Sequence, residues 1–280
     1  MAHPPMVITA AIVGAEVTRE QTPYVPLSAE EIGVEAAKCR EAGASIVHVH
    51  VRRPDGKPSQ ETALFDAAIS EIRKRTDIIV QVSTGGAVGM TAEERCGPLA
   101  LTGKTRPDMA TLSTGTVNFG DEVFENPRPL IRQIAGRIQA LGIPPEIECF
   151  DVGMIDEAYA LQKEGFIAFP CHFDFVLGVP GAVGARPEVL DLMRRSIPEG
   201  CTWTVAAVGR HQLGFAELAA EQGGNARVGL EDNIFLSKGV LAKGSFELVA
   251  EAAKRARAKG REVATPEQAR ALLRVPKVVQ

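Results

Sequence analysis

Eight short apolar segments, each followed by an amphipathic stretch, constrain the fold of this chain more than any other feature. The segments lie at residues 6–13, 45–51, 77–83, 108–114, 146–150, 166–173, 201–208 and 226–230. Apolar runs of this length that alternate with helical patterns are typical of a parallel sheet built from βαβ units. Eight such units in 280 residues favour a closed (β/α)8 TIM barrel over an open sheet. No GxGxxG follows the first segment, which disfavours a dinucleotide-binding fold.

The intervening helical stretches have recognisable ends. Ser28 and Glu31 form a capping box, and Gly43 marks the end of the same helix. The other helical patterns cover residues 61–75, 91–101, 126–142, 153–165, 186–196 and 214–224. From about residue 245 a C-terminal helical extension follows, broken at Gly260 and at Thr265–Pro266, which we interpret as a barrel helix and a subunit contact. No repeat or linker interrupts the pattern, so we expect a single barrel domain over residues 1–280.

Charge, hydropathy and cysteine spacing exclude several classes of function. The net charge is −4 and Lys and Arg are scattered among acids, so no nucleic-acid partner is expected. No apolar run approaches the roughly 20 residues that cross a bilayer, and no signal peptide is recognisable, which predicts a cytoplasmic enzyme without a membrane partner. The five cysteines form no CxxC pair, which indicates reduced thiols rather than disulfides or a Cys-rich zinc site.

The strand-like segment SIVHVHV places two imidazoles on one face. His48 and His50 are separated by one residue, and alternate strand residues point the same way. The same alternation puts Arg227 and Glu231 on one face at the end of the last strand, which lies beside the first strand in a closed barrel. Two imidazoles and a carboxylate suit a catalytic Zn²⁺ or a similar divalent ion with an open coordination position. The alternative is that the histidines are hydrogen-bonded residues of the barrel lining.

Other polar groups gather at the strand ends, where barrel enzymes have their active sites. The segment STGG at 83–86 could bind a carboxylate through Ser83 and exposed backbone amides, or it could be an ordinary strand-to-helix turn. Arg227 and Asp232 could be a structural ion pair, or Arg227 could orient Asp232 as a general base. The remaining histidines lack partners at ligand spacing and are interpreted as wall or solvated residues: His3, His172 and His211.

Several segments together resemble the beta-keto acid cleavage enzymes. They are ITAAIVGAEVTREQTPYVPLSAEEI, GASIVHVHVRRPDG, STGG, RPDMATLSTGTVNF and VGLEDNIFLSKGVLA, which extend over nearly the whole chain. The GAEVT segment is most similar to the members that cleave 3-keto-5-aminohexanoate in lysine fermentation. The resemblance implies a zinc-dependent (β/α)8 barrel, usually a homotetramer, that acts as an acyltransferase. It would convert a β-keto acid and acetyl-CoA to acetoacetate and a new acyl-CoA, here 3-aminobutanoyl-CoA.

The resemblance also assigns roles to residues. The metal ligands correspond to His48, His50 and Glu231, and the general base and its orienting partner to Asp232 and Arg227. In that role Asp232 would remove a methyl proton from acetyl-CoA. The substrate contacts correspond to Glu16, Ser83, Gly85, Gly86 and Glu148, together with Thr111 or Ser113, between which the alignment does not decide.

Glu16 bears on the choice of substrate. A substrate held by its carboxylate at Ser83 would direct its other end toward Glu16, and an acid there favours an ammonium group. The alternative is that Glu16 pairs with Arg19 or Arg52 and does not contact substrate.

Two other classes of function remain open at this point. The same ligands could serve a zinc-dependent hydrolase or a metal aldolase acting on a small carbonyl acid, neither of which needs acetyl-CoA. A non-catalytic metabolite-binding barrel would use the ion for stability alone. The sequence contains no recognisable CoA-binding motif, so the need for acetyl-CoA rests on the resemblance.

Overall fold

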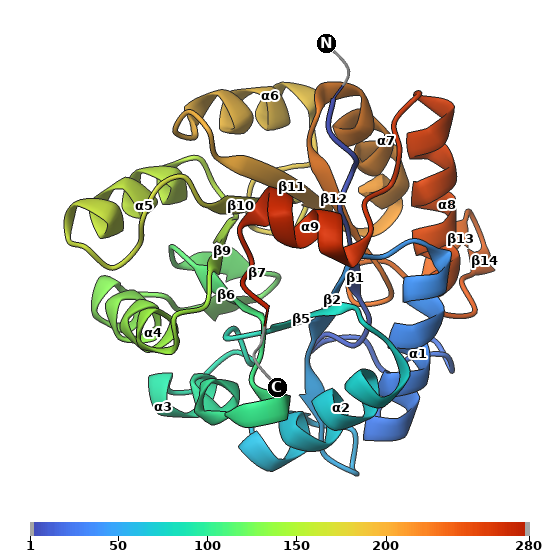
Figure 1. Ribbon diagram of the computed structural model, residues 1–280, viewed down its shortest axis with the longest axis horizontal. Helices are drawn as coiled ribbons and strands as arrows, with labels where there is room; N and C mark the ends of the chain where they lie inside the picture. The colour runs from blue at the N-terminus through green and yellow to red at the C-terminus, as the bar shows by residue number, and fades with distance from the viewer. Residues whose placement is uncertain (1–2, 278–280) are drawn as a thin grey trace.

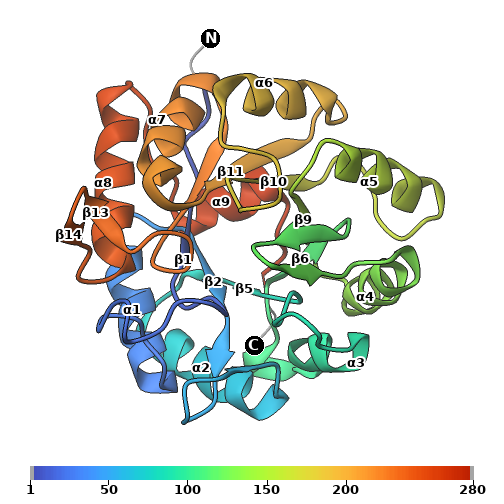
Figure 2. The ribbon, with the colours of Figure 1, turned by 180° about the vertical axis from the view of Figure 1, so that it is seen from behind.

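The core of the molecule is a closed barrel of eight parallel strands surrounded by helices (Figures 1 and 2). The structure is a computed structural model and describes residues 3–277. In chain order the barrel strands are β1 (Ile8–Ala11), β2 (Ile46–Val49), β5 (Ile79–Val82), β6 (Met109–Ser113), β9 (Pro145–Cys149), β10 (His172–Leu177), β11 (Thr202–Ala207) and β12 (Asn225–Val228). Parallel pairing of β12 with β1 closes the ring, as predicted for a (β/α)8 TIM barrel.

The sixth strand is displaced from the segment predicted for it. The apolar run at 166–173 predicted a strand, but β10 begins only at His172 and continues to Leu177. Pro170 has no N–H to donate to a neighbouring strand, so the residues before it form a connection instead. The strand therefore carries Asp174 near its middle, paired with Glu148 of β9 and Thr204 of β11.

The helices of the barrel follow their predicted ranges closely. They are α1 (Ala29–Ala42), α2 (Thr62–Arg75), α4 (Arg128–Leu141), α5 (Gly153–Lys163), α6 (Pro187–Ser196), α7 (Gln212–Gln222) and α8 (Ser245–Ala258). The capping box of Ser28 and Glu31 is present at the start of α1. No helix among residues 3–277 is long and apolar enough to cross a bilayer.

The helix predicted at 91–101 is much shorter than expected. Only one turn is α-helical, α3 (Ala92–Arg95), and it continues as the 3₁₀ turn η1 (Gly97–Ala100). Pro98 cannot donate a helical hydrogen bond. Gly97 lies so close to the chain at Gln60 that a Cβ atom would be 2.0 Å from the Gln60 carbonyl oxygen. The connection is held against β4 (Pro58–Ser59) and the start of α2 rather than extended as a helix.

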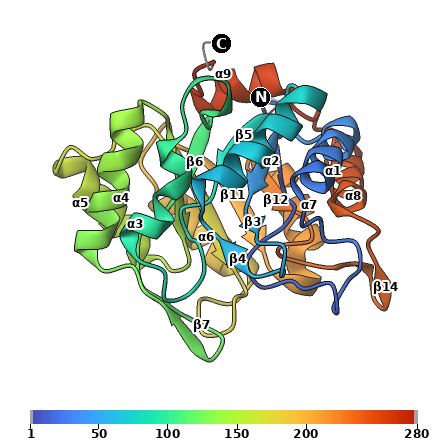
Figure 3. The ribbon, with the colours of Figure 1, turned by 90° about the horizontal axis from the view of Figure 1, so that it is seen from below.

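The N-terminal end of the barrel is closed by the last helix, α9 (Pro266–Leu273). Figure 1 shows α9 lying across the centre of the barrel, and Figure 3 shows it beyond one end of the strands. Apolar side chains from α9 and its neighbours pack against residues at the starts of four barrel strands; this sealing cluster consists of Val7, Ile46, Ile79, Met109, Ala264, Ala269, Leu273 and Val275. The C-terminal extension thus consists of the barrel helix α8 and the closing helix α9. That the extension also contacts another subunit stays a prediction.

Three small hairpins lie among the loops that follow the barrel strands. They are formed by β3 (Val51–Arg52) with β4, β7 (Val117–Phe119) with β8 (Glu122–Phe124), and β13 (Phe235–Ser237) with β14 (Val240–Leu241). Figure 3 shows β7 at the end of the molecule opposite α9. The functional side chains described next come from this C-terminal end of the barrel.

Candidate active site

A cavity of about 240 Å³ lies at the C-terminal ends of the barrel strands. Residues from the ends of all eight strands or from the loops after them line it. Its polar lining comes mainly from β12, β1, β2 and β5 and includes Glu16, His48, His50, Ser83, Arg227, Glu231 and Asp232. Its apolar lining comes from the opposite side of the ring and includes Phe119, Phe124, Phe150, Val176, Val179, Pro180 and Val208. The cavity therefore has one charged side and one apolar side.

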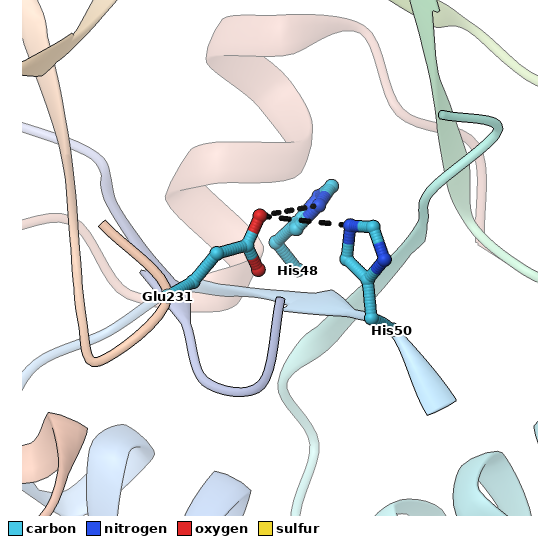
Figure 4. A group of neighbouring side chains, drawn as sticks. All are labelled: His48, His50 and Glu231. Carbon is cyan, nitrogen blue, oxygen red and sulfur yellow. Dashed lines mark ion pairs between the residues drawn. The ribbon is translucent and has the colours of Figure 1, made fainter. Parts of the chain in front are cut away.

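His48, His50 and Glu231 converge at the charged side (Figure 4). Glu231 Oε1 lies 3.5 Å from Nε2 of His48 and 3.5 Å from Nε2 of His50, and the three ligand atoms are all within 4.8 Å of one another. Ligand atoms around a tetrahedral zinc ion, with bonds of about 2.0–2.1 Å, are separated by about 3.4 Å. The spacing and the nitrogen and oxygen donor set fit a divalent ion that keeps a position open for substrate.

The local backbone explains how Glu231 reaches the two histidines. At Gly229 the backbone has φ +149°, and a Cβ atom there would be 2.1 Å from the Ala11 carbonyl oxygen. Only glycine allows the end of β12 to approach β1 this closely. The Glu231 N–H then donates to the Ala11 carbonyl at 3.1 Å, which holds Glu231 beside β1 and opposite β2.

The electrostatics of the three residues also suit a cation. Burial favours the protonated form of Glu231, but Arg227 and the two imidazoles outweigh it and lower the pKa of Glu231 to about 2. Burial lowers the pKa of His50 to about 3, against the opposing effect of Glu231. At neutral pH His50 is therefore a neutral imidazole beside a carboxylate, as metal ligands must be. The second carboxylate oxygen, Oε2, is buried without a hydrogen-bond donor among residues 3–277.

Gln81 orients His48, and the sequence reasoning missed it. Its side-chain oxygen lies 2.8 Å from Nδ1 of His48 and accepts the Nδ1 proton, which orients the ring with Nε2 toward Glu231. The contact follows from strand register, since Gln81 of β5 is paired with His48 of β2. A polar residue within an otherwise apolar buried strand was the available signal.

Arg227 contacts three residues with predicted roles: the metal ligand Glu231, the base Asp232 and the substrate contact Glu148. It donates to Asp232 through Nε at 2.9 Å and Nη2 at 3.1 Å, and Nη2 also contacts Glu231 at 2.5 Å. Its Nη1 lies 3.4 Å from Glu148, which accepts a hydrogen bond from the Ser113 hydroxyl at 2.7 Å. Burial raises the pKa of Asp232 despite the opposing charge of Arg227. The guanidinium, 6% exposed, fixes the Asp232 carboxylate at the cavity wall.

The two candidates on β6 lie in different surroundings. The Thr111 hydroxyl is fully buried and accepts the Thr84 N–H at 3.3 Å. Ser113 is bonded to Glu148, and neither Thr111 nor Ser113 is part of the cavity lining. Ser113 can therefore act on the site through Glu148, whereas Thr111 supports the turn after β5.

The STGG segment and Glu16 both border the cavity. Ser83, Gly85 and Gly86 line it, although the Gly85 N–H is already bonded to the Ser83 hydroxyl oxygen at 3.1 Å. Glu16 is exposed at the rim, and the part of the chain that the structure describes gives it no ion pair within 4.0 Å.

The arginines that could have paired with Glu16 have other partners. Arg19 pairs with Glu31 at 2.6 Å. Arg52 donates to the carbonyl oxygens of Gly14, Gly56 and Val17 at 2.9–3.0 Å. Neither arginine therefore forms an ion pair with Glu16, although the charge of Glu16 opposes the lowering of the Arg52 pKa by burial.

The apolar side of the cavity contains an aromatic cluster that the sequence reasoning did not identify. The rings of Phe119, Phe124 and Phe150 meet edge to face, with centroids 6.3–6.4 Å apart. The β7–β8 hairpin that carries the first two is fixed to the loop after β10, because the Gly120 N–H donates to the Pro180 carbonyl at 2.9 Å. A hairpin inserted within one βα connection gave no periodic signal in the sequence.

The histidines predicted not to be ligands lie apart from the triad. His172 is buried at the start of β10, where it contacts Thr202 at 2.7 Å, Thr204 at 2.9 Å and Glu146 at 3.3 Å. These contacts make His172 a wall residue of the barrel interior. Among residues 3–277, the triad of His48, His50 and Glu231 is the group of side chains spaced to hold a metal ion.

Comparison with known sequences identifies relatives over nearly the full chain. A family model described as beta-keto acid cleavage enzyme matches residues 5–275. The chain is 52% identical over 274 residues to the 3-keto-5-aminohexanoate cleavage enzyme of Fusobacterium nucleatum subsp. nucleatum, covering 97% of this chain and 98% of that protein. It is 46% identical to the enzyme of the same name from Acetoanaerobium sticklandii, covering 97% and 99%. It is 43% identical to the 3-oxoadipate:acetyl-CoA acetyltransferase of Cupriavidus necator, covering 97% and 95%.

Among solved structures, a ternary complex of ObcA with a C4-CoA adduct and oxalate has a similar fold. The TM-score is 0.78 at 21% sequence identity, and the match covers 90% of this chain and 67% of that chain. At this level of identity the similarity extends to the barrel fold only.

Proposed function

Because the chain belongs to the beta-keto acid cleavage enzyme family, whose members are acyltransferases, we propose that it cleaves 3-keto-5-aminohexanoate with acetyl-CoA. The products would be acetoacetate and 3-aminobutanoyl-CoA, and the site would hold a zinc ion at His48, His50 and Glu231. The observation that carries the proposal is the convergence of this triad with the Arg227–Asp232 pair in one cavity. The names of the two relatives that are 52% and 46% identical support the choice of substrate.

The residues present fit a bound divalent ion. Two imidazoles and one carboxylate meet at zinc-like spacing, and a buried Glu231 oxygen has no donor among the described residues. When bound, such an ion would act as a Lewis acid that polarises the ketone of the substrate and makes its neighbouring carbon more acidic.

The products determine which proton Asp232 must take. Acetoacetate contains the carboxylate and the adjacent C2 carbon of the β-keto acid, joined to the acetyl carbonyl carbon of acetyl-CoA. The new carbon–carbon bond therefore forms at C2, and the expectation that Asp232 deprotonates the acetyl methyl group is wrong on atom balance. Asp232, held by Arg227, would instead accept the C2 proton so that C2 can attack the thioester.

The same carboxyl group then returns the proton. Attack of C2 on acetyl-CoA releases the CoA thiolate, and attack of that thiolate on the substrate ketone allows the C2–C3 bond to break. The C3 fragment leaves as the new thioester, and the C2 carbanion of acetoacetate takes its proton back from Asp232. No net proton is consumed, and no nucleophilic cysteine or serine is required.

Glu16 is proposed to recognise the substrate ammonium. It lies at the cavity rim, its neighbouring arginines have other partners, and Ser83 lies on the same charged side. With the substrate carboxylate near Ser83, the amino group would approach Glu16. A hydrogen bond to a charged group contributes more than one between neutral groups, although exposure at the rim reduces the gain.

An assay of acetoacetate formation tests both parts of the proposal. We expect turnover of 3-keto-5-aminohexanoate only when acetyl-CoA is present, and a higher kcat/KM for it than for 3-oxohexanoate. Glu16→Gln should reduce this preference by up to about fivefold, since an exposed charge pair contributes about 0.2–1 kcal/mol. Glu20→Gln, an exposed acid of the same loop that does not line the cavity, is the matched control.

Different results would contradict the acyltransferase assignment and the substrate assignment. Turnover without acetyl-CoA would contradict the acyltransferase assignment and favour a hydrolase or aldolase. Equal kcat/KM for the amino and neutral substrates in the wild-type protein would contradict the substrate assignment. A preference that persists in Glu16→Gln would keep the substrate and reject Glu16 as the residue that binds its ammonium group.

A further inference from the structure

Two cysteines lie side by side at the N-terminal end of the barrel, opposite the candidate active site. Cys171 and Cys201 immediately precede His172 and Thr202, which are paired in register between β10 and β11. The Thr202 N–H donates to the Cys171 carbonyl at 3.1 Å, and the Cys171 N–H lies 3.3 Å from the Cys201 sulfur. Both residues are partly exposed, whereas Cys39, Cys96 and Cys149 are buried.

The backbone positions suit a disulfide. Neighbouring strands are about 4.8 Å apart, and the Cα atoms of disulfide-bonded cysteines are usually about 4.4–6.8 Å apart. Residues in register on neighbouring parallel strands also point to the same side of the sheet, which brings the two thiols into contact. Two of the buried cysteines contact oxygen atoms instead: Cys39 contacts Glu35 at 3.9 Å and Cys149 contacts Thr114 at 3.7 Å.

The two thiols differ in reactivity. The neighbouring Cys171 side chain, the Cys171 N–H and the charge of Arg274 lower the pKa of Cys201 to about 7, against the effect of burial. The contact with Cys201 and burial raise the pKa of Cys171. A thiolate is the nucleophilic form of cysteine, and partly exposed cysteines near a cation are typical reactive cysteines. The Cys171 N–H, 3.3 Å from the Cys201 sulfur, can stabilise a thiolate there, so Cys201 is assigned as the attacking thiol and Cys171 as its partner.

A cavity borders Cys171, while Cys201 is itself partly exposed. It has a volume of about 320 Å³ and is lined by residues that include Pro170, Cys171 and Arg274. Arg274 follows α9 in a left-handed conformation, with φ 57°. The cavity therefore lies where the closing helix α9 meets the start of β10. Its volume is far larger than a hydrogen peroxide molecule needs.

We propose that Cys171 and Cys201 form a peroxide-sensitive dithiol that is oxidised to an intramolecular disulfide. The Cys201 thiolate attacks one oxygen of a hydroperoxide, the O–O bond breaks, and Cys201 becomes a sulfenic acid while hydroxide or alkoxide leaves. The Cys171 sulfur then attacks the Cys201 sulfur, the S–O bond breaks and water leaves. In total two thiols and one hydrogen peroxide give one disulfide and two waters.

Oxidation at this place should leave the candidate active site unchanged, because the disulfide joins the starts of β10 and β11 and the cavity residues follow their ends. It closes a loop that contains β10 and α6, so the oxidised protein should unfold at a higher temperature than the reduced protein.

Thiol titration and peptide mapping after treatment with hydrogen peroxide test the proposal. We expect the full-length wild-type protein to lose two thiols per chain and to give one cross-linked species of the tryptic peptides 164–194 and 196–210. Dithiothreitol should restore both thiols. Cys171→Ser should stop at the sulfenic acid of Cys201, detected by dimedone labelling, and Cys201→Ser should react much more slowly. Cys96→Ser, a buried cysteine, is the control and should behave as the wild type.

Three outcomes would overturn the proposal. One is a wild-type protein that keeps all its thiols at peroxide concentrations that oxidise free cysteine. A second is a disulfide between chains or to another cysteine. A third is dimedone labelling of Cys201 that is equal in the wild type and in Cys171→Ser, which would show that Cys171 does not resolve the sulfenic acid. Iodoacetamide labelling of the native protein gives an independent readout, since Cys201 should be alkylated before the other cysteines.

Discussion

The two ends of the barrel are built from the same eight strands but from different chemistry. At the N-terminal end, the sealing cluster joins the strand starts to α9 through apolar contacts such as those of Ile46, Met109 and Leu273. At the C-terminal end, the strands finish in charged residues around a cavity, with Arg227 between Glu148, Glu231 and Asp232. The N-terminal end gains stability from apolar burial. The C-terminal end buries charged side chains, which costs free energy of folding.

This difference indicates which end performs the chemistry. Buried polar atoms normally have hydrogen-bond partners, and Gln81 Nε2 and Glu231 Oε2 are two of several buried polar atoms that have none among the described residues, others such as Arg73 Nε lying outside the cavity. Glu231 belongs to the triad that could hold a cation, and Gln81 contacts His48 of the same triad. Substitutions at the two ends should therefore have opposite consequences: loss of catalysis at the charged end and loss of stability at the sealed end.

The largest effect on the rate is expected for Asp232→Asn. The amide has nearly the same shape as the carboxyl group but cannot accept a proton, so kcat should fall by about 10²–10⁴-fold. Bound zinc and the melting temperature should change little, because the triad is intact. Both kcat and the bound zinc per chain are measured on the same preparation of the variant. A variant with near wild-type kcat would reduce Asp232 to an ion-pair partner of Arg227.

A smaller effect is expected for Gln81→Met. Loss of the acceptor for the His48 Nδ1 proton should weaken zinc binding by about 10–100-fold, as other changes in residues that orient metal ligands do. Zinc affinity measured by competition with a chelator checks this directly. Gln81→Glu, the matched control, keeps the acceptor and should bind zinc at least as well as the wild type. Equal affinities in Gln81→Met and the wild type would refute the orienting role.

The smallest effect on catalysis is expected at the sealed end. Leu273→Ala should lower the free energy of unfolding by about 2–5 kcal/mol, the usual cost of truncating a buried leucine, while kcat stays unchanged. Leu192→Ala is the matched control, since Leu192 is 50% exposed and its loss should change stability little. Denaturant unfolding and kcat are measured on both variants. A fall in kcat at full zinc occupancy would show that the two ends are not independent.

The sequence predicted the barrel because periodicity and capping are local properties. All eight strands overlap their predicted segments, β10 only at His172 and Phe173, and the capping box at Ser28 and Glu31 is present. The displaced β10 and the shortened helix at 91–101 follow in part from Pro170 and Pro98, which the sequence contains. The close approach of Gly97 to Gln60 depends on the fold and could not be predicted from the sequence.

Residues of the candidate site were predictable where alternation or the family resemblance pointed to them. His48, His50 and Glu231 lie together as the alternation of strand residues indicated. Gln81 was missed because its contact with His48 depends on the register of two strands. The aromatic cluster was missed because Phe119 and Phe124 belong to a hairpin within a loop, and only the fold brings them to Phe150 after β9. The homotetramer, the cytoplasmic location, the single-domain boundaries and the role of each site residue stay predictions.

Zinc reconstitution of the chelator-treated protein tests the central claim, that the charged end is a metal-dependent cleavage site, most directly. Acetoacetate formation from 3-keto-5-aminohexanoate and acetyl-CoA is measured together with bound zinc as zinc is added. The account predicts that the rate rises in proportion to bound zinc and reaches its maximum at one ion per chain, and that His48→Ala neither binds this ion nor gains activity. Full activity in zinc-free protein, or zinc-dependent activity in His48→Ala equal to that of the wild type, would contradict it.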